Sequence, residues 1–160
     1  MKKIFLLLIS VLMFSSCEED VQTNNPTIQG KLDNVFWRAI DVKATVATNG
    51  SVTITGLVRD QELVLKIPSR NPGIHTLGTH ANRVANYTLS FDNEDLFYTT
   101  GVNIGGVGEI KVIEYNQASN TITGEFRFNA VNIYNNPIGG EYLNFNEGVF
   151  YNVPVTGFDE

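Results

Sequence analysis

Two histidines, His75 and His80, lie five positions apart, and the chain contains no others. A zinc or copper site takes three or four protein ligands, so these histidines would need a partner such as Asp92 or Glu94. In a strand, side chains five positions apart point to opposite faces, and only a loop could turn both imidazoles toward one metal. We therefore expect His75 at a strand edge and His80 in a loop, with no metal and no other cofactor.

A second set of potential metal ligands is the acidic run Asp92-Asn93-Glu94-Asp95. Carboxylate and amide oxygens of this kind can bind calcium. The run lacks the Asp-x-Asp-x-Asp-Gly spacing and the distant bidentate glutamate of a calcium loop. We therefore expect a solvated turn that joins a strand at residues 87–91 to a strand at residues 96–100.

Catalytic motifs are missing from the sequence, which has no Gly-x-Ser-x-Gly and only one cysteine, Cys17. Carboxylates that hydrolyse sugars lie in pairs across a cleft, and such a pair would have to come from four glutamates: Glu109, Glu114, Glu125 and Glu141. Acids that point outward from strands are normally solvated. We therefore predict that the protein is not an enzyme.

Aromatic side chains are the remaining feature that could bind a partner. Tyr134 and Tyr142 flank the sequence Asn-Asn-Pro-Ile-Gly-Gly at residues 135–140, which is the longest irregular segment of the chain. Tyrosine is enriched in binding hot spots, and loops on a rigid scaffold commonly carry function. If the domain has a binding site, we expect it to include these two tyrosines.

The N-terminus indicates export. Two lysines precede an apolar run at residues 4–14, and small residues follow, which is the layout of a signal peptide. The run is too short for a transmembrane helix, which needs about 20 apolar residues. The sequence Phe14-Ser15-Ser16-Cys17 resembles a lipobox, with Phe in place of the usual Leu. It predicts that residues 1–16 are removed as a lipoprotein signal peptide and that Cys17 is lipidated.

Residues 17–29 are expected to form a flexible acidic tether, because they contain acids, Asn and Pro with only isolated apolar residues. Acyl chains such as palmitate on Cys17 would anchor the protein to a membrane. The sequence Glu18-Glu19-Asp20 resembles the acidic signals that send lipoproteins of Bacteroidota to the cell surface of the outer membrane, and the periplasmic face is the alternative. Loss of two lysines with the signal peptide changes the formal net charge from −6 to −8, so nucleic acid is not an expected partner.

These residues must be positioned by strands, in a single all-β domain expected at residues 30–160. The composition, rich in Asn, Gly, Thr, Val and aromatic residues, favours strands and turns. Residues 121–131 are the clearest strand, because every second side chain from Ile122 to Ala130 is apolar or glycine. Residues 51–58 and 62–67 alternate in the same way around a polar corner and predict a hairpin.

The pattern predicts about nine short strands and almost no helix, with at most a helical turn at residues 83–86. This favours an antiparallel β-sandwich or meander, and a lipocalin-like barrel is the alternative. The expected strands lie at residues 36–46, 51–58, 62–67, 74–77, 87–91, 96–100, 109–115, 121–131 and 149–155.

Five short segments together resemble a family of small uncharacterised lipoproteins of flavobacteria and other Bacteroidota, over about residues 30–156. They are FWRA at 36–39, PGIHTL at 72–77, GEIKV at 108–112, TITGEFRFNA at 121–130 and EGVF at 147–150. The resemblance is one of strand patterns. It implies the fold and a location in the envelope, and it implies no activity.

Three functional hypotheses follow from these patterns. The first is a membrane-anchored lipoprotein whose domain is a non-catalytic binding module for an envelope protein or a glycan. The second is a lipocalin-like carrier of a small apolar ligand, and the third is a metal-assisted hydrolase that uses the histidines and nearby acids. The tether, the β-scaffold and the missing catalytic motifs favour the first.

Overall fold

The computed structural model describes residues 25–91 and 94–157. Every regular element in these residues is a strand, so the all-β prediction is confirmed. The described residues contain no helix that is long and apolar enough to span a membrane. The strands are β1 (Thr27–Leu32), β2 (Val35–Arg38), β3 (Asp41–Val46), β4 (Val52–Val58), β5 (Gln61–Ile67), β6 (Gly73–Leu77), β7 (Val84–Phe91), β8 (Glu94–Thr99), β9 (Val107–Asn116), β10 (Thr121–Asn132) and β11 (Tyr142–Thr156).

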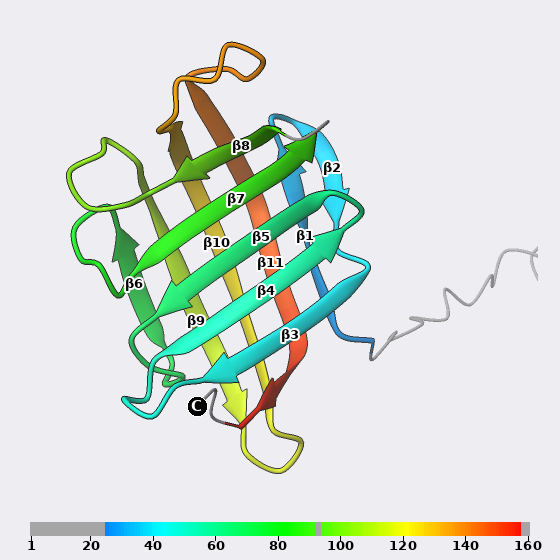
Figure 1. The fold of residues 1–160 in the computed structure, drawn as a ribbon. Coiled ribbons are helices and arrows are strands. Elements are labelled where there is room, and N and C mark those ends of the chain that lie inside the picture. The colour runs from blue at the N-terminus through cyan, green and yellow to red at the C-terminus, as the bar shows by residue number, and fades with distance from the viewer. Residues whose placement is uncertain (1–24, 92–93, 158–160) are drawn as a thin grey trace, which may run out of the picture.

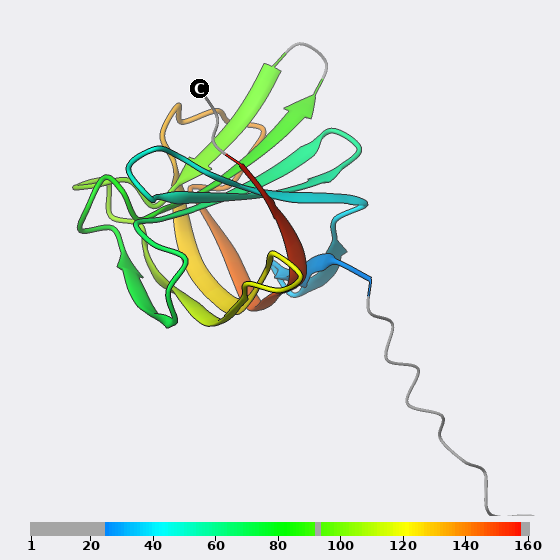
Figure 2. The same cartoon turned by 90° about the horizontal axis from the view of Figure 1, so that it is seen from below.

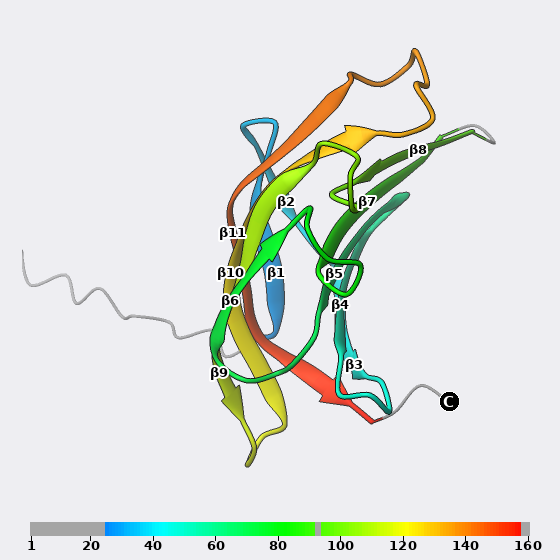
Figure 3. The ribbon, with the colours of Figure 1, turned by 90° about the vertical axis from the view of Figure 1, so that its left-hand side faces the viewer.

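The strands form two layers that face each other (Figures 1 and 3). One layer has the order β3-β4-β5-β7-β8, and the other has the order β2-β1-β11-β10-β9-β6. The view from below in Figure 2 shows that the layer with β9, β10 and β11 is the more strongly curved. Two short pairings join the layers at their edges: β11 runs parallel to β3 beside Ala44, and β8 pairs with β10 at Thr99 and Val131. The other strand pairs are antiparallel, as predicted for a sandwich with meander connections.

Aromatic rings fill the space between the layers. Phe145 is fully buried, and its ring centroid lies 5.0 Å from Phe126, 5.6 Å from Phe128 and 5.5 Å from Trp37. These distances are within the range of about 4.5–7 Å in which aromatic rings attract each other. A lipocalin-like barrel would instead hold a ligand in its interior, so the packed rings fit the sandwich.

Strand β11 is the longest element, with 15 residues, and only its second half was expected. Glu147 and Asn152 adopt left-handed backbone angles, with φ of 52° and 48°, where the register between β11 and β10 shifts. Each shift is a β-bulge, which inserts one extra residue and so displaces the alternation of buried and exposed side chains by one. The bulges keep Phe145, Phe150 and Val153 buried on the same side of the strand.

The first strand begins at Thr27, three positions before the expected start of the domain. Ile28 is fully buried and pairs with Phe150, so this part of the expected tether belongs to the sheet. The signal peptide, Cys17 and the tether as far as residue 24 lie outside the described residues.

One further expectation about the strands was wrong. The single strand expected at residues 36–46 is divided into β2 and β3, because the chain crosses between the layers at Ala39 and Ile40. The amide of Ala39 donates to the carbonyl of Ile28 in β1, whereas the amide of Ile40 donates to the carbonyl of Leu57 in β4. Residues 84–86, where at most a helical turn was expected, belong to β7, which begins at Val84 and pairs with β5.

Candidate binding site

The loop at residues 133–141 joins β10 to β11 and projects from one end of the sandwich (Figure 1). It carries the two tyrosines expected at a binding site, and 69% of Tyr134 and 52% of Tyr142 are exposed. Ile138, between them, is also exposed. The ring of Tyr134 lies 6.1 Å from that of Phe97 in β8, and Tyr142 opens β11. The loop therefore presents aromatic and apolar surface to solvent from fixed positions.

Asn132, the last residue of β10, holds this loop closed. Its side chain is 3% exposed, and its Nδ2 donates to the backbone carbonyls of Asn136 at 3.2 Å and Gly140 at 3.4 Å. Its backbone amide donates to the carbonyl of Glu141 at 2.9 Å. Asn132 thus ties the middle and the far end of the loop to the end of β10.

The loop sequence suits its path. Asn135 adopts a left-handed backbone angle, with φ of 48°, and asparagine tolerates this region better than most residues. Asn136 caps the turn, because its Oδ1 accepts from the amide of Ile138 at 3.0 Å. Gly139 lies directly against the phenol of Tyr98, and a Cβ at this position would collide with the Tyr98 oxygen. Packing on the sheet therefore fixes the shape of the loop.

A pocket of about 280 Å³ lies within this loop, lined by Asn132, Asn135, Asn136, Pro137, Gly139 and Glu141. The Oδ1 of Asn132 is buried and has no hydrogen-bond partner among the described residues. Leaving a buried acceptor unpaired costs about 1–3 kcal/mol.

Glu141 supplies the negative charge beside this pocket. A hydrogen bond to Glu141, and the negative charge of that carboxylate, raise the pKa of the Tyr142 phenol above its ordinary value. The phenol is therefore neutral at physiological pH and donates to the carboxylate.

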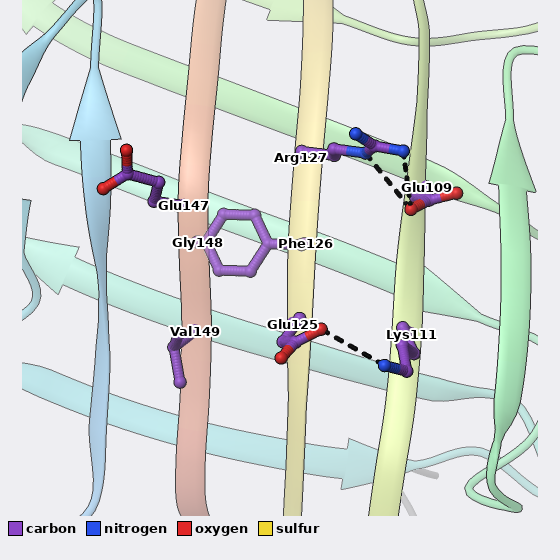
Figure 4. Close-up of a pocket in the computed structure, with 8 residues that line it drawn as sticks. All are labelled: Glu109, Lys111, Glu125, Phe126, Arg127, Glu147, Gly148 and Val149. Atoms are coloured by element: carbon purple, nitrogen blue, oxygen red, sulfur yellow. Dashed lines mark hydrogen bonds and ion pairs between the residues drawn. The ribbon is translucent and has the colours of Figure 1, made fainter.

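A second hollow, of about 330 Å³, lies on the outer surface of β9, β10 and β11 (Figure 4). It is centred on Gly148, where the ring of Phe126 occupies the place of a side chain: a Cβ on Gly148 would lie 2.5–2.6 Å from the ring. Charged side chains surround it, namely Glu109, Lys111, Glu125, Arg127 and Glu147.

Cross-strand ion pairs involve each of these charged side chains. Arg127 contacts Glu109 at 3.1 Å, Lys111 contacts Glu125 at 3.4 Å, and Glu147 contacts Lys31 of β1 at 2.7 Å. Two of the four glutamates considered for a sugar-cleaving pair, Glu109 and Glu125, therefore each face a cation. Exposed ion pairs of this kind contribute about 0–1 kcal/mol to stability. The loop at residues 133–141, with its two exposed tyrosines, is the stronger candidate for a binding site.

The sequence matches the family described as Domain of unknown function (DUF6252) over residues 24–154. The chain belongs to the DUF6252 family. A comparison with curated proteins finds no significant match, and a comparison with solved structures finds none either. The matched range begins before β1 and ends within β11, two residues before the end of that strand. The loop pocket and the hollow at Gly148 are therefore both parts of the DUF6252 domain.

The two histidines of the DUF6252 domain lie in different environments. His75 is buried in β6, where burial, and next the charge of Arg83, lower its pKa; its Nε2 has no hydrogen-bond partner among the described residues. His80 is exposed in the turn after β6, and its Nδ1 lies 2.8 Å from the Thr79 hydroxyl. In residues 25–91 and 94–157, no group of three or more His, Cys, Asp or Glu side chains is placed to hold a metal ion.

The acidic run considered for calcium lies where β7 is followed by β8. These two strands pair as a hairpin, from the pair Asn86 and Thr99 to the pair Phe91 and Glu94. Asp92 lies outside the described residues. Glu94 is the first residue of β8, and Asp95 follows it as an exposed residue of the same strand.

Asn132 and Glu141 were not expected in the site. The sequence does contain a signal for Asn132: it continues the inward series from Ile122 to Ala130, which places an amide where the pattern calls for an apolar side chain. A polar residue at an inward position must find partners within the protein or in a ligand. Glu141 has no comparable signal, because its position depends on how the loop closes.

Proposed function

We propose that the protein is an exported lipoprotein, anchored to the outer membrane through Cys17 and facing the cell surface, whose DUF6252 domain is a non-catalytic binding module. The loop at residues 133–141 is its binding surface, and the partner is a component of the envelope or its surroundings. The observation that carries this proposal is the combination of two exposed tyrosines with a loop held rigid by the buried Asn132. A rigid loop loses little conformational entropy when it binds.

The composition of the loop supports a binding role. Tyr134, Tyr142 and Ile138 expose large apolar surfaces within one short segment, and exposed apolar patches mark interaction sites. The charges on the outer surface of β9 and β10, by contrast, are paired with one another. Binding through the loop leaves these pairs undisturbed.

The binding role is tested with the full mature lipoprotein in detergent micelles, presented to an array of glycans and to cross-linked envelope extracts. We expect specific capture by the wild-type protein and at least a tenfold loss when both Tyr134 and Tyr142 are changed to alanine, since a hot-spot residue is worth about 2 kcal/mol or more. Tyr151→Ala is the matched control, because this tyrosine is partly exposed on β11 outside the loop. Equal capture by the double variant and the wild type would refute the loop as the binding surface.

The anchor is tested separately, by intact-mass measurement of the protein extracted from membranes. The expected mass is that of a chain that begins at Cys17 and carries acyl groups, and Cys17→Ser is expected to release the protein from the membrane fraction. Protease treatment of intact cells then distinguishes the cell surface from the periplasmic face. A free thiol at Cys17 would overturn the anchor without affecting the binding test.

A further inference from the structure

We infer that the edge of the domain at residues 35–41, the β2 edge, rests on the membrane that holds the lipid anchor, and that the exposed side chains of Val35, Phe36 and Ile40 enter the headgroup region. The inference rests on the proposed anchor at Cys17 and adds an orientation of the domain on the bilayer. It begins from the exposed fractions of these apolar side chains, which are 69% for Val35, 66% for Phe36 and 79% for Ile40. Ile40 is the most exposed large hydrophobic residue in the described part of the chain.

The position of β2 leaves these side chains open to a flat surface. β2 is at one edge of its layer, and β1 is its one hydrogen-bonded neighbour among the described strands (Figure 1). Trp37 turns inward against Phe145, whereas Val35 and Phe36 are exposed on the two faces of the strand. A surface that approaches the free edge therefore meets side chains of both faces. The unpaired backbone groups of an edge strand are not satisfied in hydrocarbon, so the strand stays at the level of the headgroups and the side chains reach deeper.

The place where the tether enters the domain identifies the bilayer as the partner of this edge. The amide of Ala39 donates to the carbonyl of Ile28, so Ile40 lies beside the start of β1. Cys17 precedes the first described residue, Asn25, by eight positions, and eight residues span at most about 29 Å even when fully extended. An anchor at Cys17 therefore keeps the start of β1, and the edge beside it, close to the bilayer.

The short connection also makes a small apolar contact sufficient. A tether turns docking into an intramolecular event, with an effective concentration that reaches about the millimolar range for short linkers. Three side chains therefore do not have to bind the membrane by themselves. The opposite edge of the layer, β6, also exposes an apolar side chain, Ile74, but four strands separate it from β2.

The charges along the edge favour apolar contact over electrostatic attraction. Arg38 and Asp41 flank Ile40, are both exposed and carry opposite charges. Lys31 on the neighbouring strand β1 is paired with Glu147 at 2.7 Å. The edge therefore has no excess of cations to attract anionic headgroups. We expect docking to be insensitive to salt, which screens exposed charges, and to the fraction of anionic lipid.

The inference is tested with the acylated mature protein, added from detergent to preformed vesicles of phosphatidylcholine. The chain has no cysteine besides Cys17, whose thiol is used by the anchor, so Val35→Cys and Ile40→Cys each provide a single site for a polarity-sensitive dye. Ile74→Cys is the matched control at the opposite edge. We expect the dyes at positions 35 and 40 to emit at shorter wavelength than in water and to lose more than half of their quenching by iodide. The dye at position 74 is expected to behave as in water.

A charge placed on the edge provides a second test. Phe36→Glu, combined with the dye at position 40, is expected to return the emission of this dye to that in water, because a carboxylate opposes entry into an apolar region. Thr76→Glu, at an exposed position of β6, is the matched control and should leave the emission unchanged. Urea unfolding of the unlabelled variants verifies that both substitutions keep the fold.

Three outcomes would overturn the docking while the anchor and the binding module remain. The first is emission as in water at positions 35 and 40 on an acylated protein that stays with the vesicles. The second is shielding that disappears when the protein is diluted on the vesicles, which would assign the edge to contact between two copies of the chain. The third is shielding that requires anionic lipid or is lost in salt. If Cys17 is not acylated, the anchor and the docking fail together.

Discussion

Phe145 provides a direct test of the packed interior between the two layers. Its ring is fully buried and contacts the rings of Trp37, Phe126 and Phe128 at centroid distances of 5.0–5.6 Å. Replacement of a buried phenylalanine with alanine costs about 3–5 kcal/mol, because apolar contacts are lost and a cavity remains. The cavity cannot be filled from Gly30, which touches the ring and has no side chain: a Cβ there would lie 2.5 Å from Phe145 Cε1. Phe145→Ala is therefore expected in the upper half of that range.

Urea unfolding followed by tryptophan fluorescence measures this loss. Phe145→Leu keeps most of the volume and is expected to cost less than half as much as Phe145→Ala. Phe91→Ala is the control, because 58% of this side chain is exposed, and surface changes normally stay within about 0.5 kcal/mol. A loss below about 2 kcal/mol for Phe145→Ala, with an unchanged dependence on urea, would mean that the interior is not packed as described.

Three further changes test other parts of the fold. Gly124→Ala is expected to cost about 1–3 kcal/mol, because its Cβ would collide with the ring of Phe150; Gly157→Ala, which meets nothing within 4 Å, should be neutral in the same urea titration. Burial lowers the pKa of His75 below 6.5, so stability should fall as the pH drops below that value, and His75→Leu should lose less stability than the wild type between pH 7 and pH 5. Burial raises the pKa of Tyr87, so stability should fall above about pH 10, and Tyr87→Phe should flatten this alkaline loss; an unchanged pH profile in either variant would contradict the assigned residue.

Local alternation was sufficient to predict the two central hairpins. The expected hairpins at residues 51–67 and 109–131 form as β4–β5 and β9–β10. Their turns contain Arg59 and Asn120 in left-handed conformation, with φ of 51° and 52°. Side chains that alternate over seven or more residues report which face of a strand is buried, and this information is contained in the strand itself.

The strands that alternation missed depend on residues far away in the sequence. Ile28 is the only fully buried side chain in the first half of β1, and it becomes part of a strand because it pairs with Phe150. The first half of β11 was missed because the bulge at Glu147 interrupts its alternation. Neither long-range pairing nor a bulge leaves a periodic signal in the sequence near it.

The candidate site shows the same division between local and long-range information. Tyr134 and Tyr142 could be selected from the sequence, because they border an irregular segment. The role of Asn132 could not, because its Nδ2 partners are backbone carbonyls of a loop that closes only when β10 and β11 pair. Both N–H groups of the Asn132 amide are used by loop carbonyls, whereas its Oδ1 is buried and has no partner among the described residues. The amide therefore closes the loop through its donor half, and this role can be seen only once the pairing of β10 with β11 and the path of the loop are known.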